Sequence, residues 1–386
     1  MIMQDNEKKP ALRFKGFTDP WEQRKLGELS SEFKSGDFIS ASEIAETGKY
    51  PVFGGNGLRG FTDRYNHDGE YALIGRQGAL CGNVNYSVGK SYFTEHAIAV
   101  NAGKANETRF LYYLFSTMNL GQYSGQSAQP GLAVGNLIEL ENVVPNKAEQ
   151  SKISSILTAL DTLITLHQRK YEKLVNIKKS MLDKMFPQNG ASVPEIRFKG
   201  FTDPWEQRKL GDITVELSEY ATQELGLPLL TSSRSGLMYQ DEYRDSRTTK
   251  STETLFSVVP VGTCTYRHMS DDDVFHMNIN TLEKGLVSRE YPVFEASKGN
   301  NLEFLVQHIN SSEEFKAFCA EQKKGGTRTR LYYNTLCQFT VRVPALKEQA
   351  QISQCLKKLD TLITLHQRKL EKLQNIKKSC LEKMFV

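Results

Sequence analysis

The sequence lacks the features of several large protein classes. Its six cysteines form no Cys-x-x-Cys pair and have no histidines at zinc-binding spacing, which argues against a disulfide framework or a structural metal. No apolar run is long enough to cross a bilayer, and the first nine residues lack the apolar core of a signal peptide. We therefore expect a cytoplasmic protein that makes no contact with a membrane.

Motifs of common enzymes are also missing. There is no Walker loop, no Gly-x-Ser-x-Gly elbow and no Asn-Pro-Pro-Tyr motif of amine methylation. The triplets 32–34 and 314–316, Glu-Phe-Lys, resemble the end of a metal-dependent nuclease motif, but they arise easily by chance in a chain with 24% charged residues. The run 271–273, three aspartates, is interpreted as a solvated turn rather than a metal site. We expect no catalytic residue and no metal.

One glycine motif needs separate consideration. Residues 55–60 match the dinucleotide fingerprint Gly-x-Gly-x-x-Gly, which requires a strand before it and a helix after it. The residues that follow do not predict a helix, so nucleotide binding is not indicated. Such a loop instead brings backbone close to another group, and Asn56 and Arg59 at its tip suit hydrogen bonding to base edges.

Two long segments occur twice. Residues 13–27 recur without a change as 197–211, and residues 160–170 recur as 359–369. The intervening regions are unlike, and the second is about 15 residues longer. The net charge of +4 is uneven, because the variable regions 28–148 and 212–346 are slightly acidic while the segments around the repeats are basic. Two different modules in one repeated frame are therefore predicted.

The repeats set the expected domain boundaries. We expect a first variable domain with its opening repeat, a central helix, a linker, a second variable domain with its opening repeat and a C-terminal helix. These are residues 1–148, 149–186, 187–196, 197–346 and 347–386.

Both helices carry a heptad seam. Each predicted helix is about 55 Å long at 1.5 Å per residue. The seam residues of the two copies are Ile153, Leu157, Leu160, Ile164, His167, Tyr171, Leu174, Met181 and Met185, and Ile352, Leu356, Leu359, Ile363, His366, Leu370, Leu373, Cys380 and Met384. Two matched seams predict that the helices pair with each other, and a duplicated chain favours an antiparallel pair.

The midpoints of the two helices fall at His167 and His366. In an antiparallel pair these histidines face one another and help to fix the register, as a polar residue in an apolar seam often does. The alternative is that both lie half-exposed at the edge of the seam.

The variable regions are predicted to be mixed α/β domains. Expected strands are 71–74, 96–100, 137–144, 255–259, 263–266 and 338–343, and expected helices are 107–116, 302–308 and 313–322. Trp21 and Trp205, inside the opening repeats, are interpreted as core residues rather than partner anchors.

Potential hydrogen-bond donors to nucleic acid cluster in predicted loops. Arginine and lysine pair with guanine and phosphate, and asparagine and glutamine pair with adenine. The loops are 54–66, 76–82 and 124–131 in the first region and 231–250, 266–270 and 323–330 in the second. The candidates are Asn56, Arg59, Arg64, Arg76, Gln77, Gln126 and Gln129, and Arg234, Gln240, Arg244, Arg247, Lys250, Arg267, Lys323, Lys324, Arg328 and Arg330.

The arrangement as a whole resembles the specificity subunit of a bacterial type I restriction-modification system. The resemblance rests on Trp-Glu-Gln-Arg-Lys-Leu-Gly at 21–27 and 205–211, on Leu-Asp-Thr-Leu-Ile in each helix, and on Glu-Gln-x-x-Ile-Ser at 149–154 and 348–353. It implies an α+β fold with two target recognition domains, two long antiparallel coiled-coil helices and internal pseudo-two-fold symmetry. Each recognition domain is then expected to read one half of an asymmetric bipartite site in double-stranded DNA, with the helices as spacer.

The same resemblance implies that the chain is not a catalyst. Two methyltransferase subunits and, through them, two restriction and translocase subunits are the expected partners, and S-adenosylmethionine, ATP and Mg²⁺ are expected there, with no cofactor in this chain. Two alternatives stay open from the residues. One is a fused DNA-modifying or DNA-cleaving enzyme, and the other is a protein-only scaffold, which the acidic variable regions favour.

Overall fold

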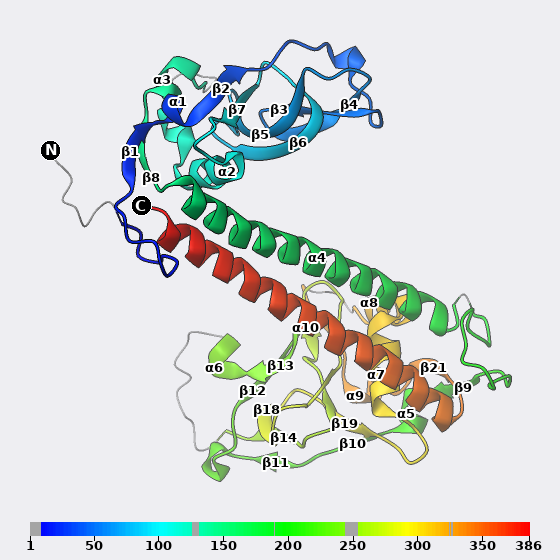
Figure 1. Ribbon diagram of the computed structural model, residues 1–386. Helices are drawn as coiled ribbons and strands as arrows, with labels where there is room; N and C mark the ends of the chain where they lie inside the picture. The colour runs from blue at the N-terminus through cyan, green and yellow to red at the C-terminus, as the bar shows by residue number, and fades with distance from the viewer. Residues whose placement is uncertain (1–8, 126–130, 189, 244–253, 324, 326) are drawn as a thin grey trace. The chain divides into compact units, whose positions relative to one another are not determined.

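The computed structural model describes residues 9–125, 131–188, 190–243, 254–323, 325 and 327–386. The chain divides into two compact units, which are Met1–Arg169 with Gln367–Val386, and Lys170–His366. Each unit holds one variable region and parts of both long helices (Figure 1). Over the described part of the chain, no helix has the length and apolar character needed to span a membrane.

The first unit is built around a six-stranded sheet of order β2-β7-β5-β6-β3-β4. Apolar residues of β5 and β7 face α2 across the main core, and α2 contributes Phe110, Leu111 and Leu114 to that core. The strands are β1 (Glu22–Lys25), β2 (Ser30–Ser35), β3 (Tyr50–Gly54), β4 (Gly57–Thr62), β5 (His67–Gly75), β6 (Val84–Phe93), β7 (Ala97–Ala102) and β8 (Glu141–Val144). The helices are α1 (Leu26–Leu29), α2 (Thr108–Thr117) and α3 (Val134–Ile138), with 3-10 turns η2 (Ala41–Glu43) and η3 (Leu120–Tyr123).

The second unit divides its strands among smaller sheets, of order β10-β19-β15-β17 and β11-β14-β18, and two-stranded ribbons. The strands are β9 (Glu206–Lys209), β10 (Thr214–Glu216), β11 (Tyr220–Ala221), β12 (Leu230–Ser233), β13 (Gly236–Tyr239), β14 (Phe256–Val259), β15 (Cys264–Thr265), β16 (Met269–Ser270), β17 (Asn278–Ile279), β18 (Gly285–Ser288), β19 (Val293–Ala296), β20 (Thr329–Arg330) and β21 (Thr340–Val343). The helices are α5 (Leu210–Ile213), α6 (Gln240–Tyr243), α7 (Leu302–Ser311), α8 (Glu313–Glu321) and α9 (Tyr333–Leu336), with the 3-10 turn η4 (Gln223–Leu225).

Several details of the expected secondary structure were wrong. The described part of the expected loop 231–250 holds most of β12 and all of β13 and α6, and the expected loops 266–270 and 323–330 include the two-residue strands β16 and β20. Residues 137–138 were expected to begin a strand, but they end the helix α3, because Leu137 turns inward to the core and the strand β8 starts only at Glu141. The expected loop 54–66 is largely the hairpin of β3 and β4, so Arg59 lies on a strand rather than in a loop. The remaining expected helices and strands are found within a few residues of their predicted ends.

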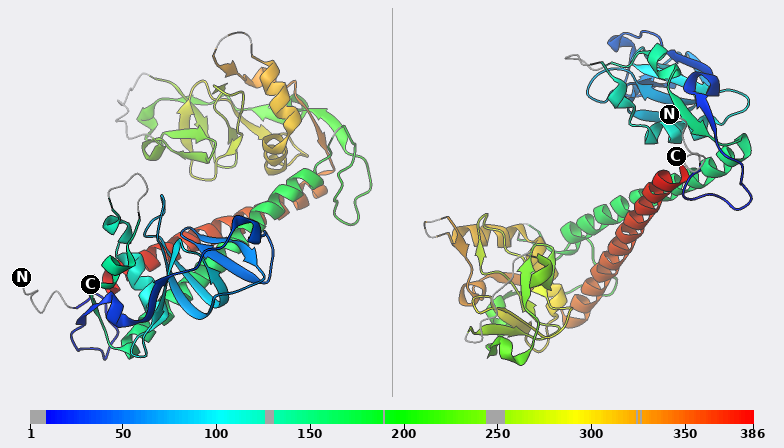
Figure 2. Two further views of the ribbon diagram at one scale, coloured as in Figure 1. Left: turned by 90° about the horizontal axis from the view of Figure 1, so that it is seen from above. Right: turned by 90° about the vertical axis from the view of Figure 1, so that its left-hand side faces the viewer.

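The two long helices are α4 (Lys147–Met185) and α10 (Leu346–Met384). In the first unit the beginning of α4 packs on the end of α10, since Leu157 shares a core with Met384 and Lys377 Nζ lies 2.5 Å from Asp161 Oδ1. In the second unit the end of α4 packs on the beginning of α10, where Lys178 Nζ lies 2.5 Å from Asp360 Oδ1. Within each unit the helices therefore run antiparallel, as predicted (Figures 1 and 2).

The seam residues are buried or half-buried along both helices. His366 is 7% exposed and belongs to the second unit, whereas His167 is half-buried and belongs to the first. The proposal that these two histidines face each other stays a prediction.

The Glu-Gln pair at the start of each long helix has one structural role in both units. Glu149 is fully buried and accepts two hydrogen bonds of 2.7 Å from Arg13, in the opening repeat. Glu348 accepts the equivalent bonds of 2.7 and 2.8 Å from Arg197. Such planar, two-pronged pairing fixes geometry as well as charge, and an acidic residue in the first turn also suits the helix dipole.

The adjacent glutamine connects the helix to the variable region. The side-chain oxygen of Gln150 accepts from the backbone N–H of Glu107, just before α2, and that of Gln349 accepts from Asn301, just before α7. The amide nitrogens of both glutamines donate to the carbonyls of Pro145 and Pro344. Two adjacent residues thus anchor the opening repeat and one helix of the variable region to the start of each long helix.

An aromatic cluster completes this frame. In the first unit Trp21 lies edge-on to Phe110, which stacks on Phe385 with ring centroids 5.4 Å apart. In the second unit Trp205 lies edge-on to Phe304, whose ring centroid is 5.4 Å from that of Phe186. Both tryptophans are 2% exposed, which confirms the interpretation of these residues as core.

The buried Arg–Glu pair generates a stability prediction. Arg197→Ala leaves the carboxylate of Glu348, 1% exposed, buried without its counter-charge, and this should lower the free energy of unfolding by about 3 kcal/mol. Arg208→Ala in the same repeat is the control, because Arg208 is 42% exposed and lies 3.8 Å from Glu206. Urea unfolding of both variants measures the difference, and equal losses would contradict a special role for Arg197.

The second aromatic cluster contains a buried histidine. His308 stacks on Phe186 at 4.7 Å, and burial lowers its pKa from 6.5 to about 4. Leu114 occupies the corresponding position of α2 in the first unit. The imidazole is therefore neutral in the folded protein near neutral pH.

This histidine predicts a pH dependence of stability. Between pH 6.5 and 4 the unfolded chain binds a proton at His308 that the folded chain does not, so stability is complete above pH 6.5 and falls as the pH drops toward 4. In His308→Leu this loss, about 3 kcal/mol, should disappear. Unfolding free energies of both proteins across this range give the difference. Parallel curves would show that His308 does not titrate in this way.

Candidate nucleic-acid interface

Three connections of the first unit meet beside the β3–β4 hairpin. Backbone hydrogen bonds join them, since the N–H of Arg76 donates to His96, the N–H of Thr94 donates to Phe53, and the N–H of Leu132 donates to Arg76. The hairpin turn at Gly55, the β5–β6 connection, the β6–β7 connection and residues 131–132 therefore form one surface.

Glycines make this close approach possible. A Cβ atom on Gly75 would lie 2.5 Å from the carbonyl oxygen of Gly55, and one on Gly82 would lie 2.2 Å from the backbone nitrogen of Gly121. Neither distance is compatible with a side chain, and Gly82 also has a positive φ of 87°. The glycine fingerprint at 55–60 thus brings backbone segments of this chain together, and no helix follows it.

Four predicted donors of the first unit lie on or beside this surface. Asn56, Arg59 and Gln77 are exposed, and Arg76 is half-buried with its guanidinium 3.4 Å from the carbonyl oxygen of Glu95. Arg64 is engaged elsewhere, because it forms an ion pair of 2.8 Å with Glu43 and lies over the ring of Tyr92. Gln126 and Gln129 lie outside the described residues.

The sequence did not indicate two further candidates. His96 is half-exposed in the same group of connections. Lys90 lies with its Nζ 4.7 Å from the ring centre of exposed Tyr65, which forms a basic and aromatic surface suited to a nucleic acid backbone and base. Alternating polar residues on β6 resemble any exposed strand, so only the folded register reveals that Lys90 and Tyr65 meet.

The nuclease-like triplet of the first region has a structural explanation. Glu32 accepts hydrogen bonds from Tyr71 at 2.9 Å and lies 2.8 Å from Lys34 Nζ. Burial opposes its ionisation, but the bonds from Lys34 and Tyr71 outweigh burial and lower the pKa of Glu32. Burial lowers the pKa of neighbouring His67. Within the described ranges, no group of three or more histidine, cysteine, aspartate or glutamate side chains is placed to hold a metal ion.

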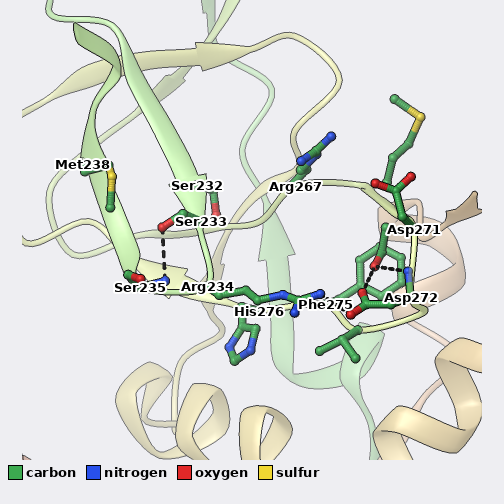
Figure 3. A pocket seen from close by; sticks show the side chains of 13 residues that line it. Ser232, Ser233, Arg234, Ser235, Met238, Arg267, Asp271, Asp272, Phe275 and His276 are labelled. Carbon is green, nitrogen blue, oxygen red and sulfur yellow. Dashed lines mark hydrogen bonds and ion pairs between the residues drawn. The ribbon is translucent and has the colours of Figure 1, made fainter. Parts of the chain in front are cut away.

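In the second unit a pocket of about 580 Å³ lies between the β12–β13 hairpin and residues 267–276 (Figure 3). Arg234 from the hairpin turn and Arg267 from the segment after β15 border it, together with Asp271 and Asp272. Serine hydroxyls and His276 add further hydrogen-bonding groups. The pocket therefore offers both charged and neutral donors to a ligand that presents acceptors.

The structure brings together part of the second predicted set. Arg234, Arg267, Arg328 and Arg330 are exposed, and β16 pairs with β20 so that Met269 lies opposite Arg330. Gln240 begins α6, and its backbone N–H donates to Leu229. Arg244, Arg247, Lys250 and Lys324 lie outside the described residues, while Lys323 Nζ lies 3.6 Å from Asp273.

Each unit also presents a pair of exposed leucines on a long helix. Leu163 and Leu166 of the first unit are 44% and 55% exposed, and Leu362 and Leu365 of the second are 41% and 44% exposed. All four belong to the repeated Leu-Asp-Thr-Leu-Ile-Thr-Leu sequence. An apolar pair that stays exposed at the same position in both units is typical of a docking surface.

Comparison with known proteins gives consistent matches. Residues 18–176 and 276–375 match the family model of the type I restriction modification DNA specificity domain. A type I restriction enzyme specificity subunit of Escherichia coli, EcoprrI, is 45% identical over 156 residues, which cover 39% of this chain and 39% of that protein. A putative specificity subunit of Haemophilus influenzae is 23% identical over 380 residues, 88% of each chain.

A solved structure has the same fold. The S subunit of a type I restriction-modification system from M. genitalium superimposes with a TM-score of 0.68 at 16% sequence identity, and the match covers 98% of this chain and 99% of that one.

Proposed function

Because this chain belongs to the type I restriction-modification DNA specificity family, we propose that it is the DNA recognition subunit of such a complex. Each unit reads one half of a bipartite site in duplex DNA, the first with the surface around Arg59 and Arg76 and the second with the pocket bordered by Arg234 and Arg267. Because the two units differ in strand order and in surface residues, the two half-sites differ and the full site is asymmetric.

One observation carries this proposal, namely an identical frame that holds two unlike reading surfaces. The Arg–Glu pair, the glutamine and the tryptophan cluster repeat in both units, whereas the six-stranded sheet of the first has no equivalent among the described strands of the second. A frame that repeats while its surfaces differ suits a protein that measures a fixed spacing between two different sequences.

The long helices supply the spacing. Each has 39 residues, which gives a length of about 58 Å, or roughly 1.7 turns of B-DNA. Two half-sites on one face of the duplex, about one turn apart, are compatible with this length. The variable regions are mildly acidic, so their affinity for DNA depends on local arginine and lysine clusters rather than on a general positive field.

We further propose that the exposed leucine pairs bind two methyltransferase subunits, one on each unit. Equivalent surfaces bind equivalent partners, and the restriction and translocase subunits associate through those partners. The methyl donor, ATP and Mg²⁺ are then bound by the partners, and this chain contributes recognition but no catalysis.

Two rival functions give different results in simple assays. A fused enzyme would methylate or cleave DNA as the purified chain alone, whereas a recognition subunit needs its methyltransferase. A protein-only scaffold would leave the affinity of the methyltransferase complex for duplex DNA unchanged. Binding that weakens steeply with added salt when this chain is present would exclude the scaffold.

The modular proposal predicts the effect of single arginine substitutions. Arg76→Ala should relax base preference at the first half-site only, and Arg328→Ala at the second only, each by about 1–3 kcal/mol of discrimination at one base pair. Sequencing of methylated adenines in cells that carry each variant measures both half-sites. A change in both halves from one substitution would refute the separate assignment of the two units.

The docking proposal predicts a change in stoichiometry. Leu163→Asp with Leu166→Asp places charges on one exposed apolar pair, and Leu362→Asp with Leu365→Asp does so on the other. Native mass spectrometry of each double variant should show one bound methyltransferase instead of two. Ser180→Asp, at an exposed position of α4 that belongs to neither pair, is the control and should retain two. Two bound copies in both double variants would exclude this surface.

A further inference from the structure

The three consecutive aspartates of the second unit hold basic side chains from two other segments, the β12–β13 turn and residues 323–330. Asp271 Oδ1 accepts a hydrogen bond of 2.7 Å from Arg328 Nε, and Asp272 Oδ2 accepts one from a terminal nitrogen of Arg234. Asp273, with a positive φ of 63°, accepts from the hydroxyl of Thr329 and lies near Lys323. The run is therefore more than a solvated turn, and each carboxylate has its own cation.

The aspartates that bind the arginines are themselves held in place. Ser270 Oγ donates to Asp272 Oδ1 at 2.8 Å, so both oxygens of this carboxylate are engaged. The strand β16 ends at Ser270 and pairs with β20, with Ser270 opposite Thr329. This pairing places the aspartates beside the segment that carries Arg328. A carboxylate held in this way restricts the arginine that it binds.

Both arginines keep N–H groups available for a ligand. Arg328 is bound through Nε, which leaves its two terminal nitrogens, and Arg234 is bound through one terminal nitrogen. Figure 3 shows the side chain of Arg234 extending across the pocket toward Asp272. Arg267 is exposed at the same pocket, and within the described ranges no acidic side chain lies within ion-pair distance of it.

These contacts contribute little to stability. Arg234 and Asp272 are 62% and 48% exposed, and Arg328 and Asp271 are 52% and 69% exposed. Exposed ion pairs stabilise a fold by about 0–1 kcal/mol each. Three adjacent carboxylates also repel a polyanion. Their presence at a DNA-reading surface therefore calls for a benefit other than folding or general attraction.

We propose that Asp271 and Asp272 are positioning residues that hold Arg328 and Arg234 for direct reading of guanine by the second unit. Guanine offers two acceptors, O6 and N7, in the major groove, and an oriented guanidinium pairs with both. Arg267 borders the same pocket as Arg234, and Arg328 contacts the lining residue Asp271. This inference rests on the proposed DNA recognition function and adds the prediction that the second half-site contains guanine.

The effect of removing the aspartates on affinity for the cognate site has opposite signs for the two possible roles, positioning of arginines and simple repulsion of phosphates. If the carboxylates only repel phosphates, their removal strengthens binding to all DNA sequences alike. If they position arginines, their removal strengthens non-specific binding slightly and weakens binding to the cognate site. The ratio of specific to non-specific affinity is therefore the quantity to measure.

The experiment uses the complex of the full chain with its methyltransferase, on a duplex carrying the methylated motif and on one with the second half-site scrambled. Asp272→Ala should lower affinity for the cognate duplex about 5- to 30-fold and should not lower it for the scrambled duplex. Asp272→Glu, which restores a carboxylate, should recover most of the cognate affinity. Asp271→Ala should act in the same direction.

The matched control is Glu219→Ala. Glu219 is 55% exposed and pairs with Lys284 at 3.0 Å, so this change removes the same charge from an exposed ion pair elsewhere in the unit. It should leave the affinity ratio unchanged. A third duplex with only the first half-site scrambled tests folding, because Asp272→Ala should keep its discrimination against that duplex.

The outcomes distinguish the inference from the function on which it rests. A wild-type complex that binds both duplexes equally would overturn the recognition function itself. A wild-type complex that discriminates, with an Asp272→Ala ratio equal to that of Glu219→Ala, would overturn the positioning role alone. A second half-site that contains no guanine would also overturn the positioning role.

Discussion

The buried Arg–Glu pair at the start of each long helix is the constraint on which the arrangement of each unit depends. Arg13 and Arg197 come from the identical opening repeat, and Glu149 and Glu348 begin the helices. A buried carboxylate is costly unless it is paired and hydrogen-bonded, so the opening repeat has to return to the helix. The strand after each tryptophan, β1 or β9, then pairs with the strand that precedes the helix.

Once this frame is fixed, the rest of each variable region is free to differ. The first unit forms one sheet whose glycine-rich connections meet, and the second divides its strands and places a pocket beside a two-stranded ribbon. Both surfaces are made of turns and strand ends, where a change of side chain costs little stability. This separation lets the base preference of a unit change without a change in the attachment of that unit to the helices.

The sequence predicted the frame better than the reading surfaces. The seam follows from helical periodicity. The burial of both tryptophans agrees with the large apolar surface of this side chain, although the opening repeat around them is rich in charged residues. The anchoring role of Glu149 and Gln150 was visible in the sequence only as a repeated phrase, because the residues that they bind, Arg13 and Glu107, lie far away in the sequence. Leu137 was assigned to a strand because a short apolar run does not distinguish a strand from a buried helical turn.

The reading surfaces depend on long-range pairing that periodicity does not encode. Loop arginines were recognised as donors, yet nothing in the sequence showed that Arg234 and Arg328 would meet adjacent aspartates. Arg64 looked equivalent to Arg59, but its pairing with Glu43 engages it away from the hairpin turn. The aspartate run was interpreted as a solvated turn because its counter-charges come from residues more than thirty positions away.

The central claim is that one frame carries two independent readers. Replacing residues 212–343 by residues 28–144 puts a second copy of the first reader into the second frame, with both joins at equivalent positions of the repeat. Sequencing of methylated adenines in cells that carry this chain should give a symmetric site, in which the first half-site appears twice in inverted orientation. A motif that keeps the original second half-site would contradict the claim.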